Sequence, residues 1–199
     1  MTASLILASA SPRRHALLAE AGFEFTIEVS DVEENFEPGT SPEEVARQLA
    51  ERKARHVAAR HQGEACRVVG ADTVVAVEVD GELRILGKPE DETEARRMLE
   101  ALSSSRQRVV TGVCVVDCAS GDVVSEFERT WVSMRRIEPA EVEAYVASGE
   151  WRGKAGGYAI QENADAFVTA LEEGGFDNVV GLPVERTRTL LERMGHGRR

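Results

Sequence analysis

LILASASPRRHAL, at residues 5–17, predicts a strand that ends in a tight turn and passes directly into a helix. The apolar run 5–8 is typical of a buried strand. Ser11 suits the N-cap, where its hydroxyl can accept a hydrogen bond from a free backbone amide, and Pro12 suits the first helical position, which requires no amide hydrogen. The first helix is therefore expected to begin at Pro12.

The turn before this helix has the features of an anion-binding site. The free amides and the positive dipole end of a helix N-terminus attract negative charge, and Ser9 and Ser11 belong to the same turn. Arg13 and Arg14 add two guanidinium groups, which bind phosphate oxygens in pairs. A polyphosphate is the ligand that this arrangement favours. The alternative is an ordinary capped helix with two solvated arginines.

Length and charge limit the classes of protein that this chain can belong to. A chain of 199 residues can bury one sizeable core, and we expect a single domain over residues 1–199. The 35 acidic and 24 basic residues give a formal net charge of −11. This charge argues against a nucleic-acid polymer as a partner, and a small polyanion must be held by a local basic pocket or through a metal cation.

The cysteines and the hydropathy pattern favour a cytoplasmic protein. Cys66, Cys114 and Cys118 are too few for a disulfide framework, and their apolar surroundings predict reduced core thiols. No apolar run has the length of a membrane span, and the short run 5–8 does not fit a signal peptide. We expect no membrane partner.

Apolar periodicity alternates between short strands and amphipathic helices, without repeats or long linkers, which indicates the α/β class. Several of the strands are joined by hairpins, as at Asp80-Gly81, so the sheet cannot be purely parallel. We expect a mixed, twisted sheet flanked by helices, forming two merged lobes with a central cleft. The expected strands are 23–29, 66–70, 73–79, 83–86, 109–116 and 123–132, and the expected helices are 42–60, 90–102 and those opened by Pro12, Pro139 and Pro183.

Lys53 lies in the middle of the apolar face that helical periodicity gives to residues 42–60. A desolvated ammonium group must find a carboxylate or a phosphate. The alternative is a snorkelling lysine, whose stem packs on apolar neighbours while its head stays in water.

Asp72 interrupts the apolar stretch 68–77, where a carboxylate is costly unless it is ligated. It could coordinate Mg²⁺ or accept a proton from a water that attacks phosphorus. Glu33 and Glu34, in the acidic loop 30–41, are candidate further ligands for the same metal. The alternatives are an Asx turn between Asp72 and Thr73, and a merely solvated acidic loop.

Two further lysines follow glycines in loops: Lys88 in Gly-Lys-Pro and Lys154 in the glycine-rich segment 153–161, which ends at Gln161. Neither is a nucleoside-triphosphate P-loop, because Pro or Ala follows where Ser or Thr would bind magnesium. The amide of Gln161 could bind a base edge. The chain also lacks a Gly-x-Ser-x-Gly elbow and any Cys or His pair at metal-ligand spacing, which argues against acyl transfer and zinc chemistry.

These motifs, in this order, resemble the Maf family of nucleoside triphosphate pyrophosphatases over nearly the whole chain. The matching segments are S9-x-S-P-R-R14, K53-A54, G70-A-D-T-V-V75, G87-K-P89, K154-A-G-G-Y-x-I-Q161 and N178-V-V-G-L-P183. The resemblance implies a mixed α/β fold shared with inosine triphosphate pyrophosphatases. It also implies metal-dependent hydrolysis, with Mg²⁺ or Mn²⁺, of a nucleoside triphosphate to the monophosphate and diphosphate.

The resemblance assigns roles to particular residues. Asp72 falls on the catalytic acid-base position, Glu34 on a loop carboxylate that joins it at the metal, and Arg13, Thr73 and Gln161 on specificity positions. The cations that would neutralise the triphosphate are Arg14, Lys53, Lys88 and Lys154. The Tyr-x-Ile-Gln ending resembles the branch that acts on dTTP and UTP, which we expect as substrates in nucleotide-pool cleaning. A homodimer is expected by the resemblance alone.

One departure affects base preference, because Glu162 stands where the family usually has glycine. A function of another class stays open beside hydrolysis: a nucleotide-binding regulator of septum formation and cell division, which would need the phosphate contacts but no general base. Nucleotidyl transfer is a third alternative and would release diphosphate only with an acceptor.

Overall fold

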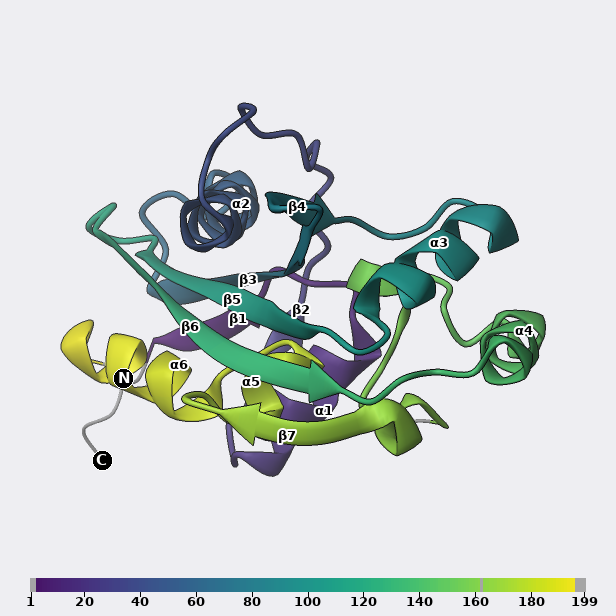
Figure 1. Ribbon diagram of the computed structural model, residues 1–199. Coiled ribbons are helices and arrows are strands. Elements are labelled where there is room, and N and C mark those ends of the chain that lie inside the picture. The colour runs from purple at the N-terminus through teal and green to yellow at the C-terminus, as the bar shows by residue number, and fades with distance from the viewer. Residues whose placement is uncertain (1–2, 162, 196–199) are drawn as a thin grey trace. The chain divides into compact units, whose positions relative to one another are not determined.

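The structure is a computed structural model that describes residues 3–161 and 163–195 (Figure 1). Its chain divides into two compact units. Unit 1 comprises Met1–Asp72, Thr111–Glu128 and Gly181–Arg199, and unit 2 comprises Thr73–Val110 and Arg129–Val180. Within the described residues, no helix is both long and apolar enough to cross a membrane. That the chain is a single domain stays a prediction.

A seven-stranded sheet has the order β2-β1-β3-β5-β6-β7, with β4 paired to β3. Strand β1 runs parallel to β2 and to β3, whereas β4 is antiparallel to β3 and β7 is antiparallel to β6, so the predicted mixed sheet is confirmed. The strands are β1 Ser4–Leu7, β2 Thr26–Ile27, β3 Cys66–Val79, β4 Glu82–Leu86, β5 Arg106–Asp117, β6 Val123–Met134 and β7 Val168–Glu172.

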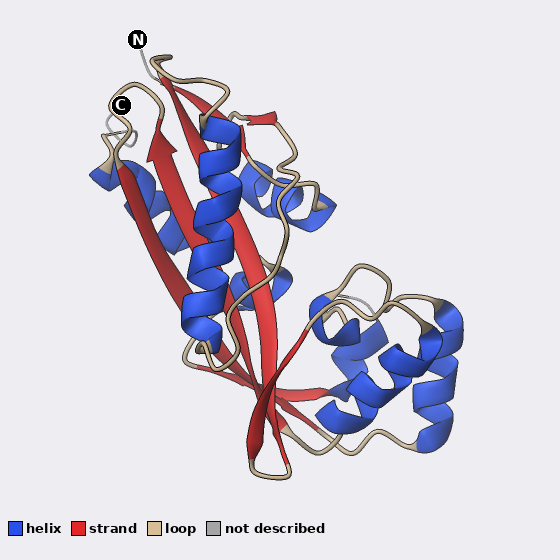
Figure 2. Ribbon diagram, turned by 90° about the horizontal axis from the view of Figure 1, so that it is seen from above, coloured by secondary structure: helices blue, strands red, loops and turns tan. Residues whose placement is uncertain are grey.

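In unit 1, helices cover both faces of the strands (Figure 1). Helix α2 (Pro42–Ala58) lies along one face, as Figure 2 shows, and α1 (Pro12–Glu20) and α6 (Val184–Arg193) cover the other. Alternate strand residues therefore enter different cores: Ile6 and Val68 pack with α2, whereas Leu7 and Val69 pack with α1 and α6. This alternation follows from the two-residue period of side chains along a strand.

Helix α2 approaches the sheet closely because two glycines lie beneath it. A Cβ atom at Gly70 would be 2.4 Å from the backbone oxygen of Ala50, and one at Gly112 would be 2.2 Å from that of Ala46. No side chain fits at such distances. The glycines thus set how near the inner face of α2 comes to β3 and β5.

Unit 2 has its own apolar core, in which β3, β5 and β6 pack with α3 (Glu92–Leu102) and α4 (Pro139–Ser148). Leu99 and Leu102 come from α3, and Val142 and Tyr145 from α4. The remaining elements of this unit are the 3-10 helices η1 Ala155–Gly157 and η2 Asn163–Phe167, strand β7, and α5 Phe176–Val180.

Helix starts and the first hairpin follow the local sequence closely. Pro12, Pro42 and Pro139 each occupy a first-turn position, and the β3–β4 hairpin turns at Asp80 and Gly81, which have φ of 54° and 79°. Positive φ at both turn residues is what the type I′ turn of a two-residue hairpin requires. The predicted helix beginning at Pro12 and the predicted hairpin are confirmed.

The predicted strand 23–29 is wrong in extent, because only Thr26–Ile27 forms β2. Phe23 and Phe25 instead pack against the core beneath α1 and α6, so their alternation reflects burial rather than strand pairing. Strand β7 was not predicted. Thr169, Ala170 and Glu172 are exposed along it, which leaves little apolar alternation to detect.

Candidate functional site

Lys53, Asp72 and Glu34 form a charged cluster in unit 1. The ammonium Nζ of Lys53 donates to Oε1 of Glu34 at 2.7 Å and also forms a short ion pair with Oδ1 of Asp72. Lys53 is 8% exposed and Asp72 is 6% exposed, whereas the Glu34 carboxylate reaches solvent. Two carboxylates from different segments therefore converge on one buried cation.

The local fold explains why Lys53 points inward. It lies on the buried face of α2 between Ala50 and Ala54, which pack over Gly70. The snorkelling alternative is wrong, because the ammonium group is buried and ion-paired. The Asx turn is also wrong, because Asp72 and Thr73 lie inside the continuous strand β3.

The turn between β1 and α1 is held by polar contacts of its own residues. The guanidinium of Arg14 donates from Nε to the carbonyl oxygen of Gly181 at 2.7 Å and from Nη1 to Ser9 Oγ at 3.4 Å. Oγ of Ser9 also accepts the amide of Ser11 at 3.2 Å. Ser9 and Arg14 are thus oriented within this turn before any ligand binds.

Ser11 occupies the N-cap position, as predicted, but its hydroxyl makes no capping hydrogen bond. That part of the prediction is wrong, because its carbonyl oxygen supplies the first helical contact by accepting the amide of His15 at 3.2 Å. His15, in α1, is not among the sequence-predicted site residues. Its Nε2 lies 2.8 Å from the carbonyl oxygen of Ser9, so this half-buried ring braces the turn.

Electrostatics connect this turn to the charged cluster. Burial lowers the pKa of Arg14, while the charges of Asp72 and Glu34 act in the opposite direction. Arg13, in the first turn of α1, adds a like charge that lowers the pKa of Arg14 further. The guanidinium of Arg14 therefore interacts electrostatically with the carboxylates of the charged cluster and with Arg13. A bound phosphate would reduce the repulsion between the two guanidinium groups.

The arrangement of Glu34 and Asp72 fits a divalent cation. Their carboxylates already converge on a single positive charge, the Lys53 ammonium, and oxygen donors are the ligands that Mg²⁺ and Mn²⁺ prefer. Glu34 and Asp72 are thus the residues that would hold such an ion.

Four predicted site residues belong to unit 2: Thr73, Lys88, Lys154 and Gln161. Thr73 is half-buried and Lys154 is buried, whereas Lys88 and Gln161 are exposed. The two lysine loops are tied together by the amide of Gly156, which donates to the carbonyl oxygen of Gly87 at 2.9 Å. Glu162, which bears on base preference, lies outside the described residues.

Glycine at position 156 is required by this loop. Its φ is 70°, and a Cβ atom there would lie 3.2 Å from the side chain of Val75. At Gly156, the glycine-rich segment is therefore a packed turn.

A buried polar chain supports the same segment and was missed by sequence reasoning. Nε2 of Gln107 donates to the hydroxyl of Tyr158 at 3.4 Å, and Ser105 donates to Oε1 of Gln107 at 2.8 Å. Burial raises the pKa of Tyr158 to about 12. The fully buried Gln107 interrupts the apolar pattern of β5, and that interruption was the available signal.

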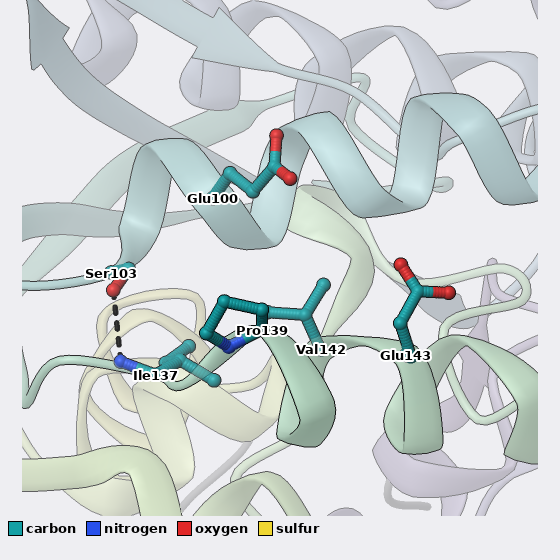
Figure 3. A pocket seen from close by; sticks show the side chains of 6 residues that line it. All are labelled: Glu100, Ser103, Ile137, Pro139, Val142 and Glu143. Atoms are coloured by element: carbon teal, nitrogen blue, oxygen red, sulfur yellow. Dashed lines mark hydrogen bonds between the residues drawn. The ribbon is translucent and has the colours of Figure 1, made fainter.

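A pocket lies between α3 and α4 (Figure 3), but its size and lining argue against a role as the functional site. Its volume is about 160 Å³, below the roughly 300 Å³ at which ligand pockets begin. Its lining includes no predicted site residue, and Ser103 Oγ there accepts the amide of Ile137 at 2.9 Å. The residues that line it are Glu100, Ser103, Ile137, Pro139, Val142 and Glu143.

Several proteins similar to this chain are named dTTP/UTP pyrophosphatase. A protein named dTTP/UTP pyrophosphatase from Hyphomonas neptunium is 46% identical over 99% of this chain and 98% of its own length. Proteins of the same name from Zymomonas mobilis subsp. mobilis and Caldicellulosiruptor saccharolyticus are 45% and 40% identical, covering 98% and 96% of this chain and 93% and 95% of their own.

A solved structure, a nucleoside-triphosphatase / dITP/XTP pyrophosphatase from Mycobacterium abscessus, covers 96% of this chain and 94% of its own. Its TM-score of 0.41 and identity of 18% are too low to support a conclusion about the fold. The family model described as "Maf-like protein", in contrast, matches residues 4–194. Together with the full-length relatives, this match shows that the chain belongs to the Maf family.

Proposed function

We propose that this protein hydrolyses nucleoside triphosphates, with dTTP and UTP as substrates, to the nucleoside monophosphate and diphosphate. Full-length relatives named dTTP/UTP pyrophosphatase support the reaction class. The observation that carries the mechanism is the buried Asp72 carboxylate, which is ion-paired with Lys53 and electrostatically coupled to Arg14.

Asp72 acts as the general base in this proposal. It accepts a proton from a water whose oxygen attacks the α-phosphorus, and the bond from that phosphorus to the oxygen bridging the β-phosphate breaks. The ion pair with Lys53 fixes the orientation of the carboxylate, and orientation within the site lowers the barrier to attack.

Cationic side chains bind the triphosphate and stabilise the charge that develops on the leaving diphosphate. We assign this role to Arg14, Lys53, Lys88 and Lys154, with Ser9 and Ser11 as further phosphate contacts in the turn. Mg²⁺ or Mn²⁺, when bound, supplies additional neutralisation of phosphate charge, and Glu34 and Asp72 would hold it.

Base selection is assigned to Arg13, Thr73 and Gln161. The exposed Gln161 carries both a donor and an acceptor, which is the chemistry needed to bind the edge of a pyrimidine. Its segment is anchored by the buried Tyr158, so the amide extends from a fixed support.

The test is diphosphate release from a panel of nucleoside triphosphates with Mg²⁺ or Mn²⁺, using wild type, Asp72→Asn and Asp117→Asn. Asp117 is a matched control, because it is also an ion-paired aspartate of unit 1, bound to Arg67 at 3.0 Å. Asp72→Asn is expected to lower the rate about 10²-fold or more while nucleotide binding persists. Asp117→Asn is expected to keep wild-type turnover.

Two results would count against this function. Nucleotide binding without diphosphate release by the wild type would favour the regulatory role, and release only with an added acceptor would favour nucleotidyl transfer. Full turnover by Asp72→Asn would remove the general-base assignment alone.

A further inference from the structure

A second group of potential ligands lies where the turn after α2 enters β3. A ring nitrogen of His61, a carboxylate oxygen of Glu64 and the sulfur of Cys66 lie within 4.8 Å of one another. The three side chains differ in burial: Cys66 is buried, His61 is half-buried and Glu64 is exposed. The sulfur of Cys66 is therefore shielded from solvent, whereas the carboxylate of Glu64 is accessible to it.

The imidazole of His61 is held by carboxylates on both nitrogens. Nδ1 lies 2.9 Å from Oε2 of Glu64, and Nε2 lies 2.7 Å from Oε1 of Glu28, which is also 3.7 Å from Arg60 through its other oxygen. These hydrogen bonds raise the pKa of His61, that from Glu64 most and that from Glu28 next.

We propose that His61, Glu64 and Cys66 form a binding site for a thiophilic divalent cation such as Zn²⁺. Imidazole nitrogen, carboxylate oxygen and thiolate sulfur are the three donor types that proteins use for zinc, whereas Mg²⁺ does not favour sulfur. At usual zinc–ligand lengths, donors around a tetrahedral ion are about 3.5 Å apart. The three donor atoms lie within 4.8 Å of one another, and the 2.9 Å between Nδ1 of His61 and Oε2 of Glu64 must widen for an ion to sit between them. Side-chain rotation of the exposed Glu64 can supply part of that movement.

The surroundings of His61 match those of a metal ligand. A ligating imidazole commonly donates its second N–H to a carboxylate, which fixes the ring and its tautomer. Nε2 of His61 keeps that bond to Glu28 while Nδ1, which faces Glu64, binds the cation. Water completes the coordination.

Proton balance follows from these assignments. The cation replaces the thiol proton of Cys66 and, where the ring is charged, the Nδ1 proton of His61, and both protons pass to solvent. No oxidation or reduction is involved. The three described cysteines are free thiols, so Cys66 is available as a ligand.

This site is distinct from the Asp72 cluster and does not depend on the proposed function. His61 follows Lys53 by eight residues, and Cys66 precedes Asp72 by six residues along β3, or about 20 Å of extended strand. The ion would instead link the end of α2 to the start of β3, the two elements that carry Lys53 and Asp72.

The test is titration of the reduced, full-length protein with Zn²⁺, and with Co²⁺ as a spectroscopic probe, in the presence of excess Mg²⁺. One tightly bound ion per chain and a thiolate-to-cobalt absorption band are expected. His61→Ala, Glu64→Gln and Cys66→Ser should each weaken binding about tenfold or more, and Cys66→Ser should abolish the band. Zn²⁺ should raise the melting temperature of the wild type but not of His61→Ala.

Matched controls are Cys114→Ser, which removes another buried thiol of unit 1, and His56→Ala, which removes a neighbouring imidazole. Both should bind as the wild type does. Asp72→Asn should also retain the site, which separates it from the proposed catalytic cluster. The inference is overturned if the wild type binds no stoichiometric Zn²⁺, or if His61→Ala and Glu64→Gln, which change accessible side chains, leave the affinity unchanged.

Discussion

The ammonium group of Lys53, on α2, forms an ion pair with the carboxylate of Asp72, on β3, and both side chains are buried. Neither charge could be removed from water alone, because the desolvation of an unpaired ion costs several kcal/mol. Glu34 lies against the same ammonium and remains open to solvent. The ion pair thus fixes the position of the Asp72 carboxylate, and that carboxylate can stay buried only while Lys53 is present.

Removing the cation of this pair should destabilise the fold. Lys53→Met leaves Asp72 buried beside no positive partner on α2, and breaking a buried pair in this way costs about 3–5 kcal/mol. The double variant Lys53→Met, Asp72→Asn should lose less than the sum of the single variants. Urea unfolding of the wild type, the two single variants and the double variant measures the coupling free energy between Lys53 and Asp72. If the losses in unfolding free energy simply add, the two side chains are not coupled.

A methyl group at Gly70 should displace α2. Because its Cβ would be 2.4 Å from the Ala50 oxygen and 2.7 Å from the Ala54 nitrogen, Gly70→Ala forces backbone to move and is expected to cost about 1–3 kcal/mol or more. Gly87→Ala is the control, because nothing lies within 4 Å of a Cβ there. Equal melting temperatures for the two variants would contradict the close approach of α2.

The buried chain from Ser105 to Tyr158 should behave as a unit. Gln107→Leu leaves the Tyr158 hydroxyl without its donor and is expected to cost about 1–3 kcal/mol, whereas adding Tyr158→Phe should restore part of that loss. Thermal unfolding of the single and double variants checks this. A double variant less stable than Gln107→Leu alone would argue against the coupling.

Acid should weaken the contact between Arg135 and Glu141, the residue that also completes the capping box of α4. The hydrogen bond from Arg135 is the largest cause that lowers the pKa of Glu141 to about 2 from 4.5. A folded-state pKa below the unfolded value stabilises the fold above about pH 4.5, and this stabilisation is lost as the pH falls toward 2.

Glu141→Gln should therefore melt below the wild type at neutral pH, and the difference should shrink as the pH falls below 4.5. Melting curves across that range provide the measurement. Glu143→Gln, which removes another Arg-paired glutamate of α4 outside the capping box, separates the cap from general charge effects. A difference that grows on acidification would reverse the assigned sign.

Substitution of Gln161 should alter substrate ranking more than peak rate. The side chain is exposed and its proposed role is to bind the base, so Gln161→Ala should change kcat/KM ratios among dTTP, UTP and purine nucleotides. Gln48→Ala is the control, because it removes another side-chain amide, one that donates to Glu44 on α2. An unchanged ranking would exclude Gln161 from base selection.

Much of the fold was predictable because its signals are local. Prolines at the starts of α1, α2 and α4, the turn at Asp80-Gly81 and the apolar faces of α2 and α3 each depend on residues within a few positions. Strands with weak alternation were harder, as the short β2 and the unpredicted β7 show.

Candidate residues could be selected from sequence because charge within an apolar pattern is costly and therefore conspicuous. Lys53 on the inner face of α2 and Asp72 within β3 were both found in this way. Gln107 is likewise a polar residue within the apolar pattern of β5, but it was not predicted as a site residue. His61 and Glu64 lie in a polar turn, where a polar side chain does not interrupt any pattern.

The sequence by itself determined most of the helices and strands and marked which polar side chains would need partners, since both depend on local periodicity and desolvation. Only the tertiary structure decided which partners they have. Lys53 is 19 residues from both Glu34 and Asp72, and it meets them because glycines beneath α2 let the helix lie close to the sheet. His61, Glu64 and Cys66 converge where the chain turns from α2 into β3, and the amide of Gly63 in this turn donates to the distant carbonyl oxygen of Cys118 at 2.8 Å.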